Sequence, residues 1–137
     1  DQVMPQAGLD CSRELYKKAG IQNPRAEIDC AEIYVPFSWF EAMWMENLHF
    51  APINEGWKMT YEGATALDGD LPVNMSGGVL STNAIGASGM VRFAEVAMQI
   101  RGQAGEHQVD GAKKVLGHAY GGGSQYFSMW ILGDKPL

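Results

Sequence analysis

Cysteines, basic residues and long apolar runs are scarce in this sequence, and each scarcity argues against a class of protein. The 137 residues include two cysteines, Cys11 and Cys30, in no CxxC or Cys/His spacing, so neither a zinc site nor a disulfide framework is expected. With 10 Lys and Arg against 16 Asp and Glu, the formal net charge of -6 argues against a nucleic-acid-binding surface. No apolar run approaches the length of a membrane span.

Phosphate-binding motifs and targeting signals are also missing. GASG lacks the spacing of the GxGxxG dinucleotide fingerprint, and GK[ST] does not occur. The first residues, DQVMPQAG, have neither the basic start nor the apolar block of a signal peptide, so a cytoplasmic protein is expected. In that compartment the two cysteines are expected to be buried thiols without a metal.

The composition is that of one folded domain. Hydrophobic residues make up 46% of the chain and charged residues 19%, which is enough apolar side chain for a sizeable core in 137 residues. We expect residues 1–9 to form an N-terminal tail or a cut end, because they carry no periodic apolar signal. Residues 10–137 are expected to form the domain.

The order of the predicted elements favours an α/β fold with helices layered on a mixed sheet. The patterns predict helices over residues 11–19, 37–50, 54–63 and 84–101, and strands over residues 28–35, 112–120 and 124–133. The last two strands are predicted to pair antiparallel through the glycine turn at residues 121–123.

The rest of the chain is predicted to be arranged around residues 73–101, VNMSGGVLSTNAIGASGMVRFAEVAMQIR. Gly77 and Gly78 permit a backbone bend that is closed to residues with a Cβ atom. Gly86 and Gly89 allow another backbone to approach the start of the following apolar helix. This central helix is therefore predicted to be buried.

Asn83 is predicted to be the N-cap of the central helix. The positive end of the helix dipole would then face the preceding loop, where it favours an anionic group or a developing oxyanion. A core helix with no chemistry at its tip is the alternative interpretation.

Candidate catalytic residues lie where the predicted strands and the central helix meet loops: Tyr34, Asn83, His118 and Tyr120. His118 could act as a general base and Tyr120 as an acid. The backbone amides of Gly121 and Gly122 could stabilise an enolate or a tetrahedral oxyanion. The same residues also fit a core histidine, packed tyrosines and plain turns.

Three motifs together resemble the thiolases. NMSGGVLSTNAIGASGMVRFAE is similar to the thiolase stretch in which Asn and a Gly pair lead to GHPIGATG and a long buried helix. HAYGGG resembles the C-terminal signature in which Cys or Asn precedes the glycine run by two residues. AEIYVPFS lies where thiolases have an NEAF or HDCF type motif. The order and spacing match from about Asp10 onward and most resemble sterol-carrier-protein-type thiolases and lipid-transfer proteins.

The resemblance implies a thiolase-like C-terminal half with a mixed five-stranded sheet. Thiolases act as dimers or tetramers on acyl-CoA thioesters, with the nucleophilic cysteine in the N-terminal half. Neither Cys11 nor Cys30 has a matching context. The implied partners are therefore an N-terminal half, on a separate chain or cleaved from a longer one, and further copies in a homo-oligomer. A coenzyme A thioester is the implied substrate, with no bound cofactor, and a small zinc-ribbon and OB-fold protein is an implied companion.

The sequence departs from the thiolase pattern at every acid or base position. Asn83 replaces the GHP histidine, Tyr34 replaces the Asn or His of the NEAF or HDCF motif, and Ala119 replaces the Cys or Asn before the glycine run. An asparagine can donate to an oxyanion but cannot act as a base near neutral pH. We expect the proton transfers to have moved to His118, Tyr120 or Tyr34.

The resemblance also implies substrate-binding positions. Gly121 is expected to keep the oxyanion amide of the family. Phe37, at the family's aromatic position, is expected to line the pantetheine channel, and Gly122 is expected to contact the substrate.

Three functions remain open at this point. The first is an acyl-CoA acyltransferase of the Claisen type, with the cysteine supplied by the N-terminal half. The second is a retro-aldol lyase on a CoA-linked side chain that uses Tyr120. The third is a non-catalytic subunit that completes the fold.

Overall fold

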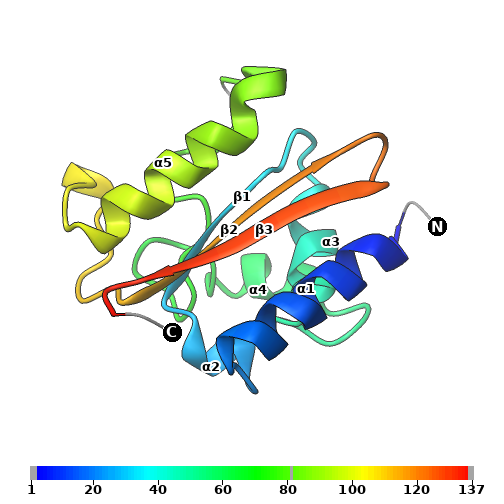
Figure 1. Cartoon of the computed structure of the whole chain (residues 1–137), viewed down its shortest axis with the longest axis horizontal. Helices are drawn as coiled ribbons and strands as arrows, with labels where there is room; N and C mark the ends of the chain where they lie inside the picture. The colour runs from blue at the N-terminus through cyan, green and yellow to red at the C-terminus, as the bar shows by residue number, and fades with distance from the viewer. Residues whose placement is uncertain (1–2, 81, 136–137) are drawn as a thin grey trace.

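A three-stranded mixed sheet lies between two layers of helices in the computed structural model, which describes residues 3–80 and 82–135 (Figure 1). The strand order is β1 (Cys30–Ile33), β2 (Lys114–Gly121), β3 (Tyr126–Gly133). β1 pairs parallel to β2, and β2 pairs antiparallel to β3. The predicted α/β fold, its mixed sheet and the antiparallel pairing of the last two strands are confirmed.

The expected five-stranded sheet is not found in the described part of the chain, where three strands form. A fourth segment runs beside β1 but is reduced to a single parallel bridge between Ala31 and Val73. Pro72 has no amide hydrogen to continue a ladder, and Asn74 has a φ of 54°, which turns the chain out of the extended conformation. These two residues limit the segment to one bridge.

Four helices cover one face of the sheet and its edge, as Figure 1 shows. They are α1 (Gln6–Ala19), α2 (Pro24–Glu27), α3 (Phe40–Asn47) and α4 (Gly56–Tyr61). Residues 6–9, expected to be part of a tail, form the first turn of α1 after Pro5, whose φ of -67° already suits a helix start. α1 ends at Gly20, which has a φ of 68°, as its stop signal predicts.

The main core lies between this helical layer and the sheet. Trp44 of α3 is fully buried and contacts the ring of His118 on β2 with a centroid separation of 5.0 Å. Ile33 and Leu116, on neighbouring strands, are also fully buried beneath the helices. Of the two cysteines predicted to be buried, Cys30 is buried and Cys11 is partly exposed.

α5 (Ser88–Ile100) covers the opposite face of the sheet (Figure 1). The close approach predicted at Gly89 is confirmed. A Cβ atom on Gly89 would lie 3.0 Å from the Cβ atom of Ala119 on β2, so the helix and the strand are in close contact at this glycine. The expected close approach at Gly86 is wrong, because no atom of the described residues, apart from those of its chain neighbours, lies within 4 Å of the position that a Cβ atom would take.

The prediction of a buried central helix is correct for one face of α5 only. Arg92 and Val96 are buried against the sheet, whereas Met90 is 70% exposed and Phe93 is 40% exposed. Phe93 contacts the ring of Trp130 on β3 at a centroid separation of 5.6 Å, and the rest of this second, apolar face is exposed among the described residues. No helix within residues 3–80 and 82–135 is both long and apolar enough to cross a bilayer.

Candidate functional site

A cleft of about 560 Å³ opens where the C-terminal ends of β1 and β2 meet the start of α5. Because the two strands are parallel, their C-terminal ends lie at the same edge of the sheet, which is where α/β folds commonly bind ligands. The cleft is lined by Tyr34, Pro36, Phe37, Asn83, Ile85, Gly86, Gly89, Ala119, Tyr120 and Gly121. Five predicted site residues therefore lie together: Tyr34, Phe37, Asn83, Tyr120 and Gly121.

The side-chain oxygen of Asn83 accepts three hydrogen bonds at the cleft wall. The donors are the amide of Ile85 at 2.9 Å, the hydroxyl of Ser88 at 2.8 Å and the phenol of Tyr34 at 3.3 Å. The prediction that Asn83 caps α5 is wrong. A turn of 3₁₀ helix (Ile85–Ala87) lies between them, and Ala87 occupies the N-cap position. The Nδ2 group of Asn83 has no protein partner within the described residues and is free to donate to a ligand.

Two tyrosines meet in the cleft. The rings of Tyr34 and Tyr120 have centroids 5.2 Å apart and are tilted by 41°. Burial raises the pKa of Tyr120 to about 12, with a smaller contribution from Tyr34. At neutral pH the Tyr120 phenol is therefore protonated and can donate a hydrogen bond or a proton.

His118 does not line the cleft. Its side chain lies on the same face of β2 as Tyr120, but it is fully buried and its ring packs against Trp44 and Phe127. Burial lowers the pKa of His118 to about 3, so the ring is neutral at physiological pH. The Tyr34 amide donates to the His118 carbonyl at 3.1 Å and, at 3.4 Å, to its Nδ1. This arrangement places His118 as a support of the Tyr34 backbone.

The glycine run at the end of β2 is divided between cleft and turn. Gly121 lines the cleft, but Gly122 does not. Gly122, Gly123 and Ser124 all have left-handed backbone angles, with φ of 60°, 61° and 67°, and form the tight turn into β3. Gly122 therefore serves the hairpin, where glycine adopts a positive φ at little cost.

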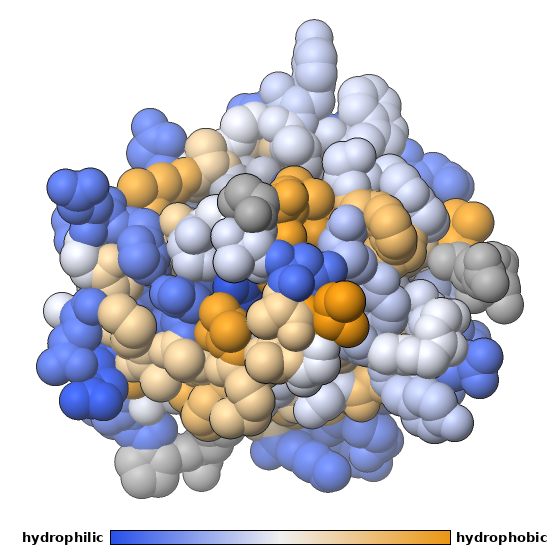
Figure 2. Space-filling model, turned by 90° about the horizontal axis from the view of Figure 1, so that it is seen from above, coloured by the Kyte–Doolittle hydropathy of each residue, from blue (hydrophilic) through white to orange (hydrophobic). Residues whose placement is uncertain are grey.

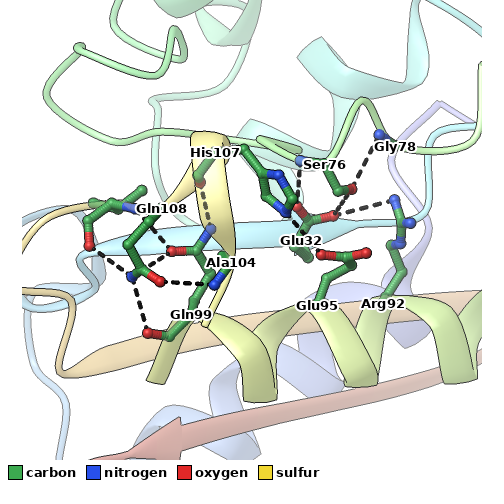
Figure 3. Close-up of polar contacts among 10 residues, drawn as sticks. Glu32, Ser76, Gly78, Arg92, Glu95, Gln99, Ala104, His107 and Gln108 are labelled. Atoms are coloured by element: carbon green, nitrogen blue, oxygen red, sulfur yellow. Dashed lines mark hydrogen bonds and ion pairs between the residues drawn. The ribbon is translucent and has the colours of Figure 1, made fainter. Parts of the chain in front are cut away.

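A buried ion pair beside the cleft was not predicted from the sequence. Glu32 of β1 and Arg92 of α5 are both almost fully buried, with an Oε2–Nη1 distance of 3.1 Å (Figure 3). The Glu32 carboxylate also accepts from the amide and hydroxyl of Ser76, at 3.0 and 2.9 Å. Burial raises the pKa of Glu32 despite these bonds and the nearby guanidinium. The pair joins β1 to α5, and Ser76 ties the segment before the glycine turn to the same carboxylate.

Removing Arg92 is expected to destabilise the fold strongly. Arg92→Met leaves a buried carboxylate without its cation, a change that costs about 3–5 kcal/mol of unfolding free energy. Because burial raises the pKa of Glu32, lowering the pH protonates this carboxyl and removes the unpaired charge. The loss of unfolding free energy caused by Arg92→Met should therefore be smaller at about pH 5 than at about pH 7.5. Urea unfolding at both pH values measures it, with exposed Arg101→Met as the control. If Arg92→Met and Arg101→Met lose the same unfolding free energy at both pH values, the ion pair does not stabilise the fold in the way described.

The described residues do not provide a nucleophilic thiol or a metal centre at the cleft. Neither cysteine lines it, and burial raises the pKa of Cys30 to about 12, which leaves that thiol protonated and unreactive. No group of three or more His, Cys, Asp or Glu side chains within residues 3–80 and 82–135 could hold a metal ion.

Comparison with known sequences places this cleft in a family. The profile described as thiolase C-terminal domain-like matches residues 1–134, which include every segment that forms the cleft. The chain belongs to the thiolase C-terminal domain-like family. The predicted resemblance is thereby confirmed.

Relatives of this thiolase-like domain are considerably longer. Acetyl-CoA acetyltransferase of Methanothermobacter thermautotrophicus is 37% identical over 117 residues, covering 85% of this chain and 30% of that protein. Sterol carrier protein 2 of Homo sapiens is 34% identical over 137 residues, covering 96% of this chain and 25% of that protein. The solved structure of the Ltp2-ChsH2(DUF35) aldolase matches with a TM-score of 0.83 at 29% identity, covering 96% of this chain and 33% of that chain. The thiolase-like domain therefore spans about a quarter to a third of the length of these relatives.

Proposed function

We propose that this chain is the C-terminal part or subunit of a thiolase-like enzyme that makes or breaks a carbon–carbon bond beside a coenzyme A thioester. The family assignment supports the reaction class. The free Nδ2 of Asn83 and the protonated phenol of Tyr120 support it as well, because both can donate to the enolate oxygen that forms when a bond to the α-carbon breaks. Phe37 then lies at the mouth of the cleft, where the pantetheine arm would enter.

The uncovered face of α5 supports an N-terminal half as the partner. Met90, Val91 and Phe93 expose apolar surface along this helix. Figure 2 looks onto the side of the molecule that carries α5 and shows apolar side chains, orange and tan, gathered across this face. Such a surface marks an interface, and two thirds or more of each relative's length lies outside the matched region. A homo-oligomer and a zinc-ribbon and OB-fold companion remain predictions from the resemblance.

Retro-aldol cleavage is the reaction that the cleft supports best. In a β-hydroxyacyl thioester the Cα–Cβ bond breaks, the hydroxyl loses its proton as it becomes a carbonyl, and Cα gains a proton. The net change is transfer of one proton from oxygen to carbon. Tyr120 can protonate Cα. A base must accept the hydroxyl proton and return it to Tyr120, and the N-terminal half would have to supply that base, because no cleft residue described in this chain is a base near neutral pH. The observation that carries this proposal is the cluster of Tyr34, Asn83 and Tyr120 at the cleft. Tyr34 and Asn83 stand at two acid or base positions of the thiolase pattern, and Tyr120 follows Ala119 at the third.

Acyl transfer is the second candidate, and the 37% identity to an acetyl-CoA acetyltransferase favours it. This reaction needs a nucleophilic cysteine and a base that ionises it. The N-terminal half would have to supply both, because no cleft residue described in this chain is a base near neutral pH.

Product analysis on the complete enzyme, with both halves present, separates these reactions. A retro-aldolase converts a β-hydroxyacyl-CoA into a carbonyl compound and one shorter thioester without free coenzyme A. A thiolase consumes one coenzyme A per β-ketoacyl-CoA and yields two thioesters. We expect cleavage of the β-hydroxyacyl-CoA at the same rate with and without free coenzyme A. Strict dependence on coenzyme A would favour acyl transfer, and no turnover of either substrate would indicate a structural subunit.

A further inference from the structure

The orientation of the Asn83 amide is set by its neighbours. The carbonyl oxygen of Asn83 lies among three donors, of which the amide of Ile85 cannot reverse its role. A flipped Asn83 would place its own NH₂ group against that amide and turn its oxygen toward a developing enolate. The observed orientation instead presents Nδ2 as the donor to a ligand in the cleft.

The backbone beside Asn83 is strained to hold this arrangement. Ile85 has a φ of 47°, a left-handed conformation that a β-branched side chain rarely adopts and that costs on the order of 1–3 kcal/mol. Its side chain is 76% exposed, so core packing does not compensate for the cost in the described residues. The conformation does place its amide 2.9 Å from the Asn83 oxygen.

Ser88 supplies the second fixed contact. It is 1% exposed at the first position of α5, where a buried hydroxyl needs a partner. Its Oγ donates to the Asn83 oxygen at 2.8 Å, the shortest of the three bonds. The serine does not line the cleft itself. Its effect on a ligand there must pass through Asn83.

We propose that Ser88 is a positioning residue whose hydroxyl, together with the Ile85 amide, holds Asn83 so that Nδ2 donates to the thioester enolate oxygen. This inference rests on the function proposed for the cleft. Ser88→Ala should leave the Ile85 contact in place but allow the amide to rotate away from the donating geometry. The loss of one well-aligned hydrogen bond should then lower kcat about tenfold, with little change in KM.

The chain offers a rescue variant and a matched control. Ser88 also borders a separate cavity of about 220 Å³, which has room for the methyl group of Ser88→Thr, so this variant keeps the hydroxyl and should retain most of the activity. Ser12→Ala removes another fully buried serine hydroxyl, on α1, whose partners are the carbonyls of Leu9 and Asn47. It should leave kcat of the complete enzyme unchanged.

A double-mutant cycle separates positioning from a general structural effect. In an Asn83→Ala background, Ser88→Ala should cause no further loss of kcat, because its target is gone. An equal loss in both backgrounds would overturn the proposal, as would a Ser88→Ala enzyme as active as Ser12→Ala.

A second measurement does not depend on activity. The ¹⁵N relaxation of the Asn83 side-chain amide, assigned by comparison with Asn83→Ala, should show a rigid NH₂ group in the parent and in Ser88→Thr. It should show a mobile one in Ser88→Ala. If the complete enzyme cleaves neither test substrate, the proposed function fails, and this measurement still decides the role of Ser88: an equally rigid amide in Ser88→Ala overturns it.

Discussion

Replacing Tyr120 with phenylalanine is expected to lower kcat for carbon–carbon bond cleavage by roughly 10²–10⁴-fold, the usual effect of removing a general acid. The substitution deletes one hydroxyl and keeps the ring, which packs near Phe40 and Trp44 at 5.5 and 5.0 Å. Stability should therefore change little. Steady-state kinetics of the complete enzyme, with thermal unfolding beside it, measures both quantities.

The control for this experiment is Tyr126→Phe. Tyr126 is the first residue of β3, across the hairpin turn from Tyr120. It is largely exposed and does not line the cleft, so removing its hydroxyl should leave kcat unchanged. A Tyr120→Phe enzyme that retains parental kcat would exclude Tyr120 as the acid and would leave acyl transfer, or a structural role, as the function of this chain.

Introducing a charge on the open face of α5 is expected to disrupt the complete enzyme. Met90→Glu places a carboxylate at a position that is 70% exposed in this chain and that we propose to be covered by the N-terminal half. An unpaired charge buried in an apolar interface costs several kcal/mol, so association should weaken by more than about 30-fold. Sedimentation velocity measures this for halves on two chains, and the melting temperature of the complete enzyme measures it for halves on one chain.

Ile53→Glu provides a matched control for the α5 variant. Ile53 is also apolar, and 64% exposed, but it lies in the loop between α3 and α4, on the other side of the sheet from α5. This change should leave assembly intact. If Met90→Glu and Ile53→Glu behave alike, the face of α5 is not the interface between the halves.

The sequence was sufficient to predict five of the residues that meet at the cleft. Tyr34 and Tyr120 each lie at the C-terminal end of a strand, and Asn83 precedes the helix that packs across both strands. Parallel pairing of β1 with β2 then brings them to one edge. Glycine patterns also marked the bend at Gly77 and Gly78, which have φ of 87° and 61°.

The remaining features depend on packing that a strand or helix pattern does not encode. The alternation along β2 places His118 and Tyr120 on one face, but His118 lies two residues further from the end of the strand and is fully buried, so only the tyrosine reaches the cleft. A charged residue such as Arg92 in an apolar helix could have signalled a buried partner. Its spacing of four residues from Ser88 places both residues on the inward face of the helix. Glu32 lies sixty residues away in the sequence, and nothing in its local sequence pattern identifies it as the partner of Arg92.

The two α5 faces show the same limit in another form. The inward face of this helix buries Ser88, Arg92 and Gln99 with Val96, whereas Met90, Val91 and Phe93 are exposed, so an apolar pattern alone predicts the wrong face to be buried in this chain. Burial of the second face requires atoms from outside these residues, which a pattern within the chain cannot supply.

In the proposed two-half enzyme, the exposed rim of the cleft is expected to make activity depend on protein concentration. Phe37, Asn83 and Ile85 all line the cleft and are exposed in this chain, so the cleft is open to water until the proposed N-terminal half covers it. For halves on separate chains, specific activity should fall on dilution as the complex dissociates, and adding either half in excess should restore it. Halves joined in one polypeptide should keep the same activity per molecule at every dilution.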